Sequence, residues 1–289
     1  HYCSRRQRQM CIRDSGMTVV SFATSAPELI VSLNATLDGF PNFAIGNVLG
    51  SNIANIGLVL GIITIIYPIS LKQRFYTSDF PLLLISTFLF YIIIYTGYQI
   101  SRSEGFILLF SITAILIYLF IYQKKSISEF SDDFDRSKIS ILKSFMYIIF
   151  SGFLLWLGSE TLIKSAISVA NKFEISQRVI SITMVAIGTS IPELAASIVA
   201  SLKKQNDLSI GNLIGSNIFN LLVVIGITSS ITPISGIETS TIFNDMLWVV
   251  LFSVIILPLA LIGRKNVLTR KKGIMLLALY LIFIIPLIV

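Results

Sequence analysis

A five-residue motif that occurs twice constrains this chain more than any other feature. Thr24-Ser25-Ala26-Pro27-Glu28 recurs as Thr189-Ser190-Ile191-Pro192-Glu193, 165 positions further along (193 − 28). At that offset, and with no gap, 21 of the 46 positions from 17 to 62 are identical to their counterparts. Composition alone would give roughly one match in ten, so the chain contains an internal duplication. Each copy places a proline and a carboxylate inside an apolar stretch, and the fold must accommodate that combination twice.

The apolar content of the chain indicates a membrane protein. Hydrophobic residues make up 54% of the sequence and charged residues only 13%, well outside the range of soluble domains. The apolar runs are about twenty residues long, which is the length that crosses a bilayer core. We therefore predict an all-α polytopic membrane protein, with spans at 17–37, 42–67, 79–98, 104–122, 141–169, 176–202, 208–231, 241–263 and 273–289.

The duplication predicts how these spans are organised. A span at 141–169 precedes the second copy of the motif, whereas the first copy follows the N-terminal tail directly. We expect ten spans when intact, five per repeat, with nine visible here and the first one missing. Because five is odd, the two repeats would cross the membrane in opposite directions, an arrangement found in transporters. The expected divisions are a tail at 1–15, a first repeat at 16–122, a linker at 123–139 and a second repeat at 140–289.

The tail at 1–15 differs from the rest of the chain. It carries four arginines, both cysteines and the single histidine, and it continues abruptly into a repeat. We interpret it as a foreign segment, the alternative being a native basic arm. The remaining sequence has no Cys or His, which excludes disulfides, zinc or copper sites and a Ser-His triad. We therefore expect no enzyme activity, no cofactor, and only metal ions that accept oxygen ligands.

Loop charges predict the orientation of the chain. The positive-inside rule assigns the positively charged loops to the cytoplasm. One alternate set of loops contains only Arg102, Lys172 and Arg178, while the other, and so the expected cytoplasmic set, contains Lys72, Arg74, Lys124, Lys125, Arg136, Lys138, Lys203, Lys204, Arg264, Lys265, Arg270, Lys271 and Lys272. The acidic linker is then cytoplasmic, and we interpret it as a solvated connector in preference to a calcium sensor.

The prolines suggest that two spans are broken. Ser25-x-x-Glu28 has the form of a capping box with Pro27 in the first helical turn, and this alone would be an ordinary helix start. Inside a membrane span it implies two half-helices, because Pro27 and Pro192 remove the hydrogen bonds to the carbonyls of residues 23 and 188. Lipid offers no partner for such carbonyls, whereas a bound cation would.

The two carboxylates point to an ion site more directly. A charged side chain inside the membrane costs several kcal/mol and is a functional-site hypothesis by default. Glu28 and Glu193 occupy equivalent positions, which packing alone does not explain. Thr24 and Thr189 lie four residues before them and so share their helix faces.

A second repeated motif adds neutral oxygen ligands. Gly46-Asn47-x-x-Gly50-Ser51-Asn52-x-x-Asn55 recurs at 211–220. The glycines have the small-xxx-small spacing of closely packed membrane helices. Ser51 with Asn55, and Ser216 with Asn220, form polar stripes whose oxygens suit hard cations. The asparagines at 47, 52, 212 and 217 are expected to be mainly structural.

The predicted site suits exchange of hard cations. Two carboxylates with many neutral oxygens fit calcium, which takes six to eight oxygen ligands, better than magnesium, which retains its water. One divalent or two monovalent cations balance the two charges. Since an empty doubly charged site is costly to carry through a low dielectric, exchange is favoured over one-way transport.

Together the two motif pairs resemble the alpha-repeats of the sodium/calcium exchanger family, in the cation/calcium antiporter superfamily, and the short loops resemble its prokaryotic branch. The resemblance implies ten helices in inverted repeats, sodium-driven calcium extrusion by alternating access, and a bacterial or archaeal inner membrane. It implies that Glu28 and Glu193 are the central ligands of calcium and sodium. It further implies contributions from Thr24, Ser25, Ser51, Thr189, Ser190 and Ser216, from the backbone carbonyls of Ser21 and Ala186, and flanking roles for Asn55 and Asn220.

This chain departs from the family pattern at three points. Ala23 replaces the usual glycine before the threonine, and Asn220 stands where some relatives have aspartate, which weakens a case for potassium coupling. In the family the missing first span forms a sliding gate with the one at 141–169, so this chain is expected to bind ions without necessarily transporting them. The expected partners are calcium, sodium and the lipid bilayer, with no nucleic acid and no obligate protein.

Two other functions remain open. The runner-up is a calcium/proton antiporter of the same superfamily, whose members carry a Gly-Asn-Ala-x-Glu type signature in place of the motif found here. A cation channel is the other alternative, and inverted repeats count against it. An intramembrane hydrolase would need a nucleophile with a base, which the absence of His disfavours.

Overall fold

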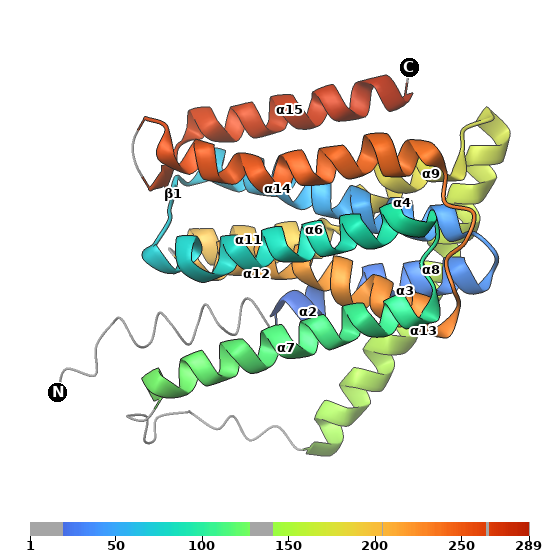
Figure 1. Ribbon diagram of the computed structural model, residues 1–289, viewed down its shortest axis with the longest axis horizontal. Helices are drawn as coiled ribbons and strands as arrows, with labels where there is room; N and C mark the ends of the chain where they lie inside the picture. The colour runs from blue at the N-terminus through green and yellow to red at the C-terminus, as the bar shows by residue number, and fades with distance from the viewer. Residues whose placement is uncertain (1–19, 128–140, 204, 264–265, 289) are drawn as a thin grey trace.

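The computed structural model describes residues 20–127, 141–203, 205–263 and 266–288. They form a bundle of helices with one short two-stranded antiparallel sheet (Figure 1). The described elements, with π-helical segments marked η, are α2 (Ser21–Thr24), α3 (Ala26–Leu37), α4 (Pro41–Ala54), η2 (Asn55–Leu60), α5 (Gly61–Ile66), β1 (Ile69–Ser70), η3 (Phe75–Asp79), α6 (Phe80–Gly97), α7 (Arg102–Ile127), α8 (Ile141–Phe173), α9 (Gln177–Ile180), η4 (Ser181–Val185), α10 (Ala186–Thr189), α11 (Ile191–Leu202), α12 (Asn206–Phe219), η5 (Asn220–Val224), α13 (Ile225–Ile231), η6 (Thr241–Asp245), α14 (Met246–Leu261), β2 (Val267–Leu268) and α15 (Arg270–Ile288).

The helices have the length and surface of membrane spans. Within the described residues, six helical segments are long and apolar enough to cross a bilayer, at 41–66, 75–97, 102–119, 177–202, 206–231 and 241–261. Their outward faces carry large apolar side chains such as Ile85, Ile92 and Phe110, the last 74% exposed. In water such faces would be a liability, and in lipid they are the expected surface. The chain is therefore an all-α multi-pass membrane protein, as predicted.

The predicted spans coincide with helices, and the differences lie at their ends. The helix predicted from 79 begins at Phe75, and the one predicted from 273 begins at Arg270. The first turn of each helix contains polar residues, and a search for apolar runs does not include them. Hydropathy therefore places these helix starts too late. The sheet was not predicted: Ile69 pairs with Leu268 and Ser70 with Val267. The foreign-tail interpretation of 1–15 and most of the acidic linker fall outside the described residues.

The helix that carries the Gly-Asn motif, and its counterpart in the other repeat, form the centre of the bundle. The segment Pro41–Ile66 runs through α4, η2 and α5, and Asn206–Ile231 runs through its counterpart α12, η5 and α13. Of the most apolar 18-residue window in each, 78% and 94% of the residues are buried. Helix α15 packs beside α5 and α7 beside α13, at opposite margins of the bundle (Figure 1). The polar residues of the Gly-Asn motif and of its copy thus lie where protein surrounds them.

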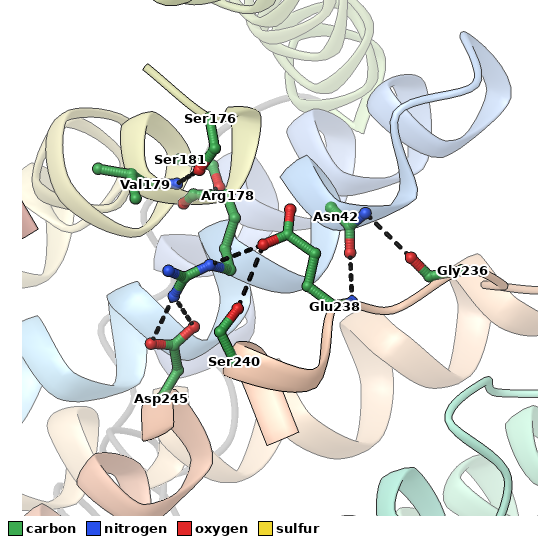
Figure 2. Close-up of polar contacts among 9 residues, drawn as sticks. All are labelled: Asn42, Ser176, Arg178, Val179, Ser181, Gly236, Glu238, Ser240 and Asp245. Atoms are coloured by element: carbon green, nitrogen blue, oxygen red, sulfur yellow. Dashed lines mark hydrogen bonds and ion pairs between the residues drawn. The ribbon is translucent and has the colours of Figure 1, made fainter. Parts of the chain in front are cut away.

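A polar network joins several helix ends at one end of the bundle (Figure 2). Arg178 of α9 donates through Nη1 to both carboxylate oxygens of Asp245 in η6, at 2.8 and 2.6 Å. Its Nε donates to Glu238 Oε2 at 3.1 Å. Asn42, near the start of α4, donates to the carbonyl of Gly236 and accepts from the Glu238 N–H, both at 3.0 Å. The start of α9 is therefore connected to the end of η6, and the starts of α9 and α4 are both connected to the loop that precedes η6.

The opposite end of the bundle carries the sheet and another set of polar contacts. Lys72, just after β1, forms an ion pair with Asp207 at the start of α12. Tyr76 donates its hydroxyl proton to Asn266 Oδ1 at 2.8 Å. These contacts join the η3–α6 segment to α12 and to the loop that precedes β2.

Candidate site between the two repeats

Both copies of the Thr-Ser-x-Pro-Glu motif lie at a break in a helix. In the first, α2 ends at Thr24 and α3 begins at Ala26, with Ser25 between them at φ −84° and ψ 3°. In the second, α10 ends at Thr189 and α11 begins at Ile191, with Ser190 at φ −80° and ψ 0°. A proline lies in the first turn of each following helix, where it has no N–H to continue the ladder. The predicted half-helices are thus present in both repeats.

The serines at these breaks do not act as helix caps. Neither Ser25 nor Ser190 makes a side-chain capping bond, so the capping-box reading is wrong. Ser25 Oγ instead donates to Glu193 Oε1 of the other repeat, at 3.5 Å. Ser190 Oγ is buried and has no hydrogen-bond partner among the described residues. The two serines therefore break the symmetry of the site.

The two carboxylates lie fully buried and nearly without hydrogen bonds. Glu28 and Glu193 are both 0% exposed and near enough to interact electrostatically. Within the described part of the chain, both oxygens of Glu28 and Oε2 of Glu193 have no hydrogen-bond partner. Buried polar atoms are almost always paired, and an unpaired buried carboxylate is costlier still. Either a bound cation or protonation would offset the cost of these three oxygens.

Hydroxyl groups from both repeats surround the carboxylates. Thr24 of α2 lies 3.3 Å from Ser216 of α12, oxygen to oxygen, and Thr189 of α10 lies 3.1 Å from Ser51 of α4. These two contacts are equivalent under the 165-residue offset, and each crosses from one repeat to the other. The hydroxyls of Thr24, Ser25 and Ser216 lie close to the Glu193 carboxylate, and that of Thr189 lies close to Glu28.

The asparagines of the second motif meet where α4 and α12 cross. Asn52 Nδ2 donates to the carbonyl of Asn217 at 3.2 Å, and Asn217 Nδ2 donates to the carbonyl of Asn52 at 3.1 Å. Asn55 Nδ2 donates to Asn217 Oδ1 at 3.0 Å, whereas the amide of Asn220 has no partner among the described residues. Asn55 and Asn220 are also the first residues of the π-helical segments η2 and η5, and such segments are frequent at functional sites.

The glycines of the first copy let α4 approach the second broken helix. A Cβ on Gly50 would lie 2.4 Å from the carbonyl oxygen of Ile182, and one on Gly46 would lie 2.0 Å from Ser181 Oγ. Both distances are far below van der Waals contact. The predicted packing role is confirmed for this copy, and for the glycines at 211 and 215 it stays a prediction. This contact places Ser51 beside Thr189.

The remaining predicted ligands differ in how the structure places them. Ser21 donates its hydroxyl proton to the carbonyl of Asn212 at 2.9 Å, and its own carbonyl accepts from the Ser25 N–H at 2.9 Å. The carbonyl of Ala186 accepts the Ser190 N–H at 3.0 Å in the same way. Ser190, Asn55 and Asn220 form no hydrogen bond with either carboxylate. Sequence reasoning missed Ser32 and Ser197, buried serines that accept from Asn47 and Asn212, although both are serines at the 165-residue offset.

The atoms around the carboxylates form an oxygen-only ligand set. Carboxylate, hydroxyl and amide oxygens converge here, and among the described residues no group of three His, Cys, Asp or Glu side chains forms a different kind of metal site. Such a set suits sodium and calcium and is a poor match for metals that prefer nitrogen or sulfur. The donor chemistry thus agrees with the unpaired charge.

The fold and the site define a class of protein: a membrane protein of two related halves with a buried carboxylate site between them. The sodium/calcium exchanger protein family matches residues 15–122 and 143–289. The chain therefore belongs to the sodium/calcium exchanger family.

Individual relatives are similar to this chain over most of its length. The inner membrane protein YrbG of Escherichia coli is 36% identical, over 75% of this chain and 69% of the relative. The putative antiporter CaxA of Alkalimonas amylolytica is 32% identical, over 92% and 85%. A solved structure of the sodium-calcium exchanger NCX_Mj superposes with a TM-score of 0.69 at 32% identity, covering 95% of this chain and 87% of that one.

Proposed function

We propose that this protein is a secondary antiporter that exchanges sodium for calcium across the membrane by alternating access. The observation that carries the proposal is the pair of buried carboxylates, Glu28 and Glu193. Three of their four oxygens have no hydrogen-bond partner among the described residues. The family membership supports the same assignment, as do the names of two relatives, a putative antiporter and a sodium-calcium exchanger.

Charge balance supports exchange between these two ions. The carboxylates carry two negative charges when ionised, which one calcium or two sodium ions neutralise. Leaving both charges unpaired in a low dielectric costs several kcal/mol per ion. A site that must be filled in order to reorient couples the inward movement of one load to the outward movement of the other.

The proposed ligands come from both repeats. They are the carboxylates of Glu28 and Glu193, the side-chain oxygens of Thr24, Ser25, Ser51, Thr189, Ser190, Ser216, Asn55 and Asn220, and the carbonyls of Ser21 and Ala186. Cross-repeat contacts within this set support a single shared site. The same proposal places the positively charged loops and the repeat linker in the cytoplasm.

Calcium uptake into sodium-loaded proteoliposomes tests the function. We expect uptake that needs an outward sodium gradient and falls to background in Glu193→Gln, because the amide keeps the shape but removes one charge. Glu104→Gln is the matched control, since Glu104 lies outside the site and binds Ser101 at a helix start. Uptake that ignores sodium and follows a pH gradient would favour the calcium/proton alternative. Normal exchange by Glu193→Gln would overturn the site.

A further inference from the structure

Two asparagines, one in each central helix, hold the threonines of the opposite repeat. Thr189 Oγ1 lies 3.2 Å from Asn47 Oδ1, and Thr24 Oγ1 lies 3.4 Å from Asn212 Oδ1. The two contacts are equivalent under the 165-residue offset, and both cross the boundary between the repeats. Asn47 and Thr189 are both buried, so water does not compete for their bond, whereas Thr24 in the second contact is half-buried.

Further hydrogen bonds fix which way each amide points. Asn47 Nδ2 donates to Ser32 Oγ at 3.0 Å, and Ser32 Oγ in turn donates to the carbonyl of Ala44 at 3.4 Å. Asn212 Nδ2 donates to Ser197 Oγ at 3.4 Å. With its N–H groups directed at its own repeat, each asparagine presents only its carbonyl oxygen to the threonine. That oxygen can accept a proton and cannot donate one.

Each threonine proton has a second acceptor within reach. Thr189 Oγ1 also lies 3.3 Å from the carbonyl oxygen of Ala186, and Thr24 Oγ1 lies 3.3 Å from that of Ser21. A threonine in a helix ordinarily donates its hydroxyl proton to a backbone carbonyl three or four residues earlier in the chain. A threonine that donates to its asparagine leaves this carbonyl with a lone pair available to a cation. Its own oxygen can then accept a proton from Ser51 or Ser216.

We propose that Asn47 and Asn212 are positioning residues that set the direction of two hydrogen-bond chains. One chain runs from Ser51 to Thr189 to Asn47, and the other from Ser216 to Thr24 to Asn212. Each directs its hydroxyl protons away from the carboxylates, so that oxygen lone pairs and the carbonyls of Ala186 and Ser21 face the ion. The inference rests on the proposed function, because it assigns how that same site is kept electronegative.

A double-mutant cycle in calcium binding tests the inference. The full chain is purified in detergent, and calcium affinity is measured by titration with and without competing sodium. We expect Asn47→Ala to weaken calcium binding about three- to tenfold, the worth of one hydrogen bond. The same loss should persist in a Thr189→Ser background, which keeps the hydroxyl, and should vanish in Thr189→Val, which lacks it.

The symmetry of the site supplies a second, independent variant. Asn212→Ala should weaken binding similarly, with Thr24→Ser and Thr24→Val as its backgrounds, so the test survives if one variant fails to fold. Thr87→Val controls for a buried hydroxyl far from the site, since Thr87 contacts Ser253 between α6 and α14. A merely structural asparagine would lower the amount of folded protein and leave the affinity unchanged.

The outcomes separate this inference from the proposed function. Equal losses from Asn47→Ala in the Ser and Val backgrounds would overturn the positioning role while leaving the ion site intact. An unmodified chain that binds no calcium, or binds it as well with Glu193→Gln, would overturn the proposed function itself.

Discussion

At the scale of single residues, the site combines two carboxylates that the fold buries without satisfying. Soluble proteins avoid this arrangement because an unpaired buried charge destabilises the folded state. Here Glu28 contributes two unpaired oxygens and Glu193 one. Such residues reduce stability in the absence of a ligand, and their presence in both repeats supports the proposal that they bind ions.

Removing one charge should therefore stabilise the ion-free protein while abolishing its response to calcium. We expect Glu28→Gln to raise the unfolding temperature in buffer free of sodium and calcium, by an amount equivalent to about 1–3 kcal/mol. Unmodified protein should instead be stabilised when calcium is added, because a ligand that binds only the folded state shifts unfolding upward. Thermal unfolding in detergent with and without calcium measures both effects. A Glu28→Gln protein that is less stable without ions, and still stabilised by calcium, would contradict the assignment.

The residues that sequence analysis identified were those whose chemistry is visible without a partner. A carboxylate or proline inside an apolar span is conspicuous, and Glu28 and Pro27 each recur 165 residues further along, which strengthens the prediction. The contacts of Ser25 and Asn47 with the opposite repeat could not be predicted, because each partner atom lies more than a hundred residues away in the sequence. Ser25 looked like a helix cap, and only the contact with Glu193 shows otherwise.

At the scale of elements, close packing between α4 and the second broken helix holds the site together. Gly50 approaches the backbone of η4, where a carbonyl oxygen cannot move aside as a flexible side chain can. The presence of these helices was predictable from hydropathy, and the close approach from the glycine spacing. No pattern in the sequence predicts the π-helical segments that begin at the asparagines at 55 and 220, because a π-bulge arises from packing among neighbouring helices.

Adding one methyl group at this contact should be harmful, whereas the same change at a nearby open position should not. We expect Gly50→Ala to destabilise the protein by about 1–3 kcal/mol, because it overpacks the contact with Ile182. Gly188→Ala is the control: a Cβ there would meet no atom within 4 Å, and the equivalent position in the first repeat is already Ala23. Thermal unfolding of the two variants compares them directly. Equal tolerance of both changes would show that the helices can separate freely.

At the scale of the whole molecule, polar contacts at helix ends hold parts of both repeats in register. Arg178 and its acidic partners connect α9 to η6, and Asn42 connects α4 to the loop before η6 (Figure 2). Sequence analysis used Arg178 only as a loop charge. Its partner Asp245 is 1% exposed on its side chain, which places the pair inside the protein and not on its surface.

Breaking this ion pair from one side should cost more than removing it altogether. Arg178→Met leaves the Asp245 carboxylate buried without its cation, and we expect a loss of about 3 kcal/mol in the free energy of unfolding. Adding Asp245→Leu should recover part of that loss, since two apolar side chains leave no uncompensated charge. Unfolding of both variants in detergent gives the comparison. A double variant that is no more stable than Arg178→Met alone would contradict this prediction, because the uncompensated Asp245 charge would then not be the source of the loss.

The reciprocal contacts between repeats also bear on how the protein is made. When the first repeat leaves the ribosome, Asn47 and Ser51 are already in the membrane, while Thr189 lies 142 and 138 residues further along the chain and has not been synthesised. Glu28 likewise enters the bilayer before Glu193 and the hydroxyls of the second repeat exist. It follows that the first half is inserted with its polar groups held only by interim partners such as water or the insertion machinery. Translation of the second half supplies the missing partners, so a chain that stops early leaves the Glu28 carboxylate without the second repeat's side chains.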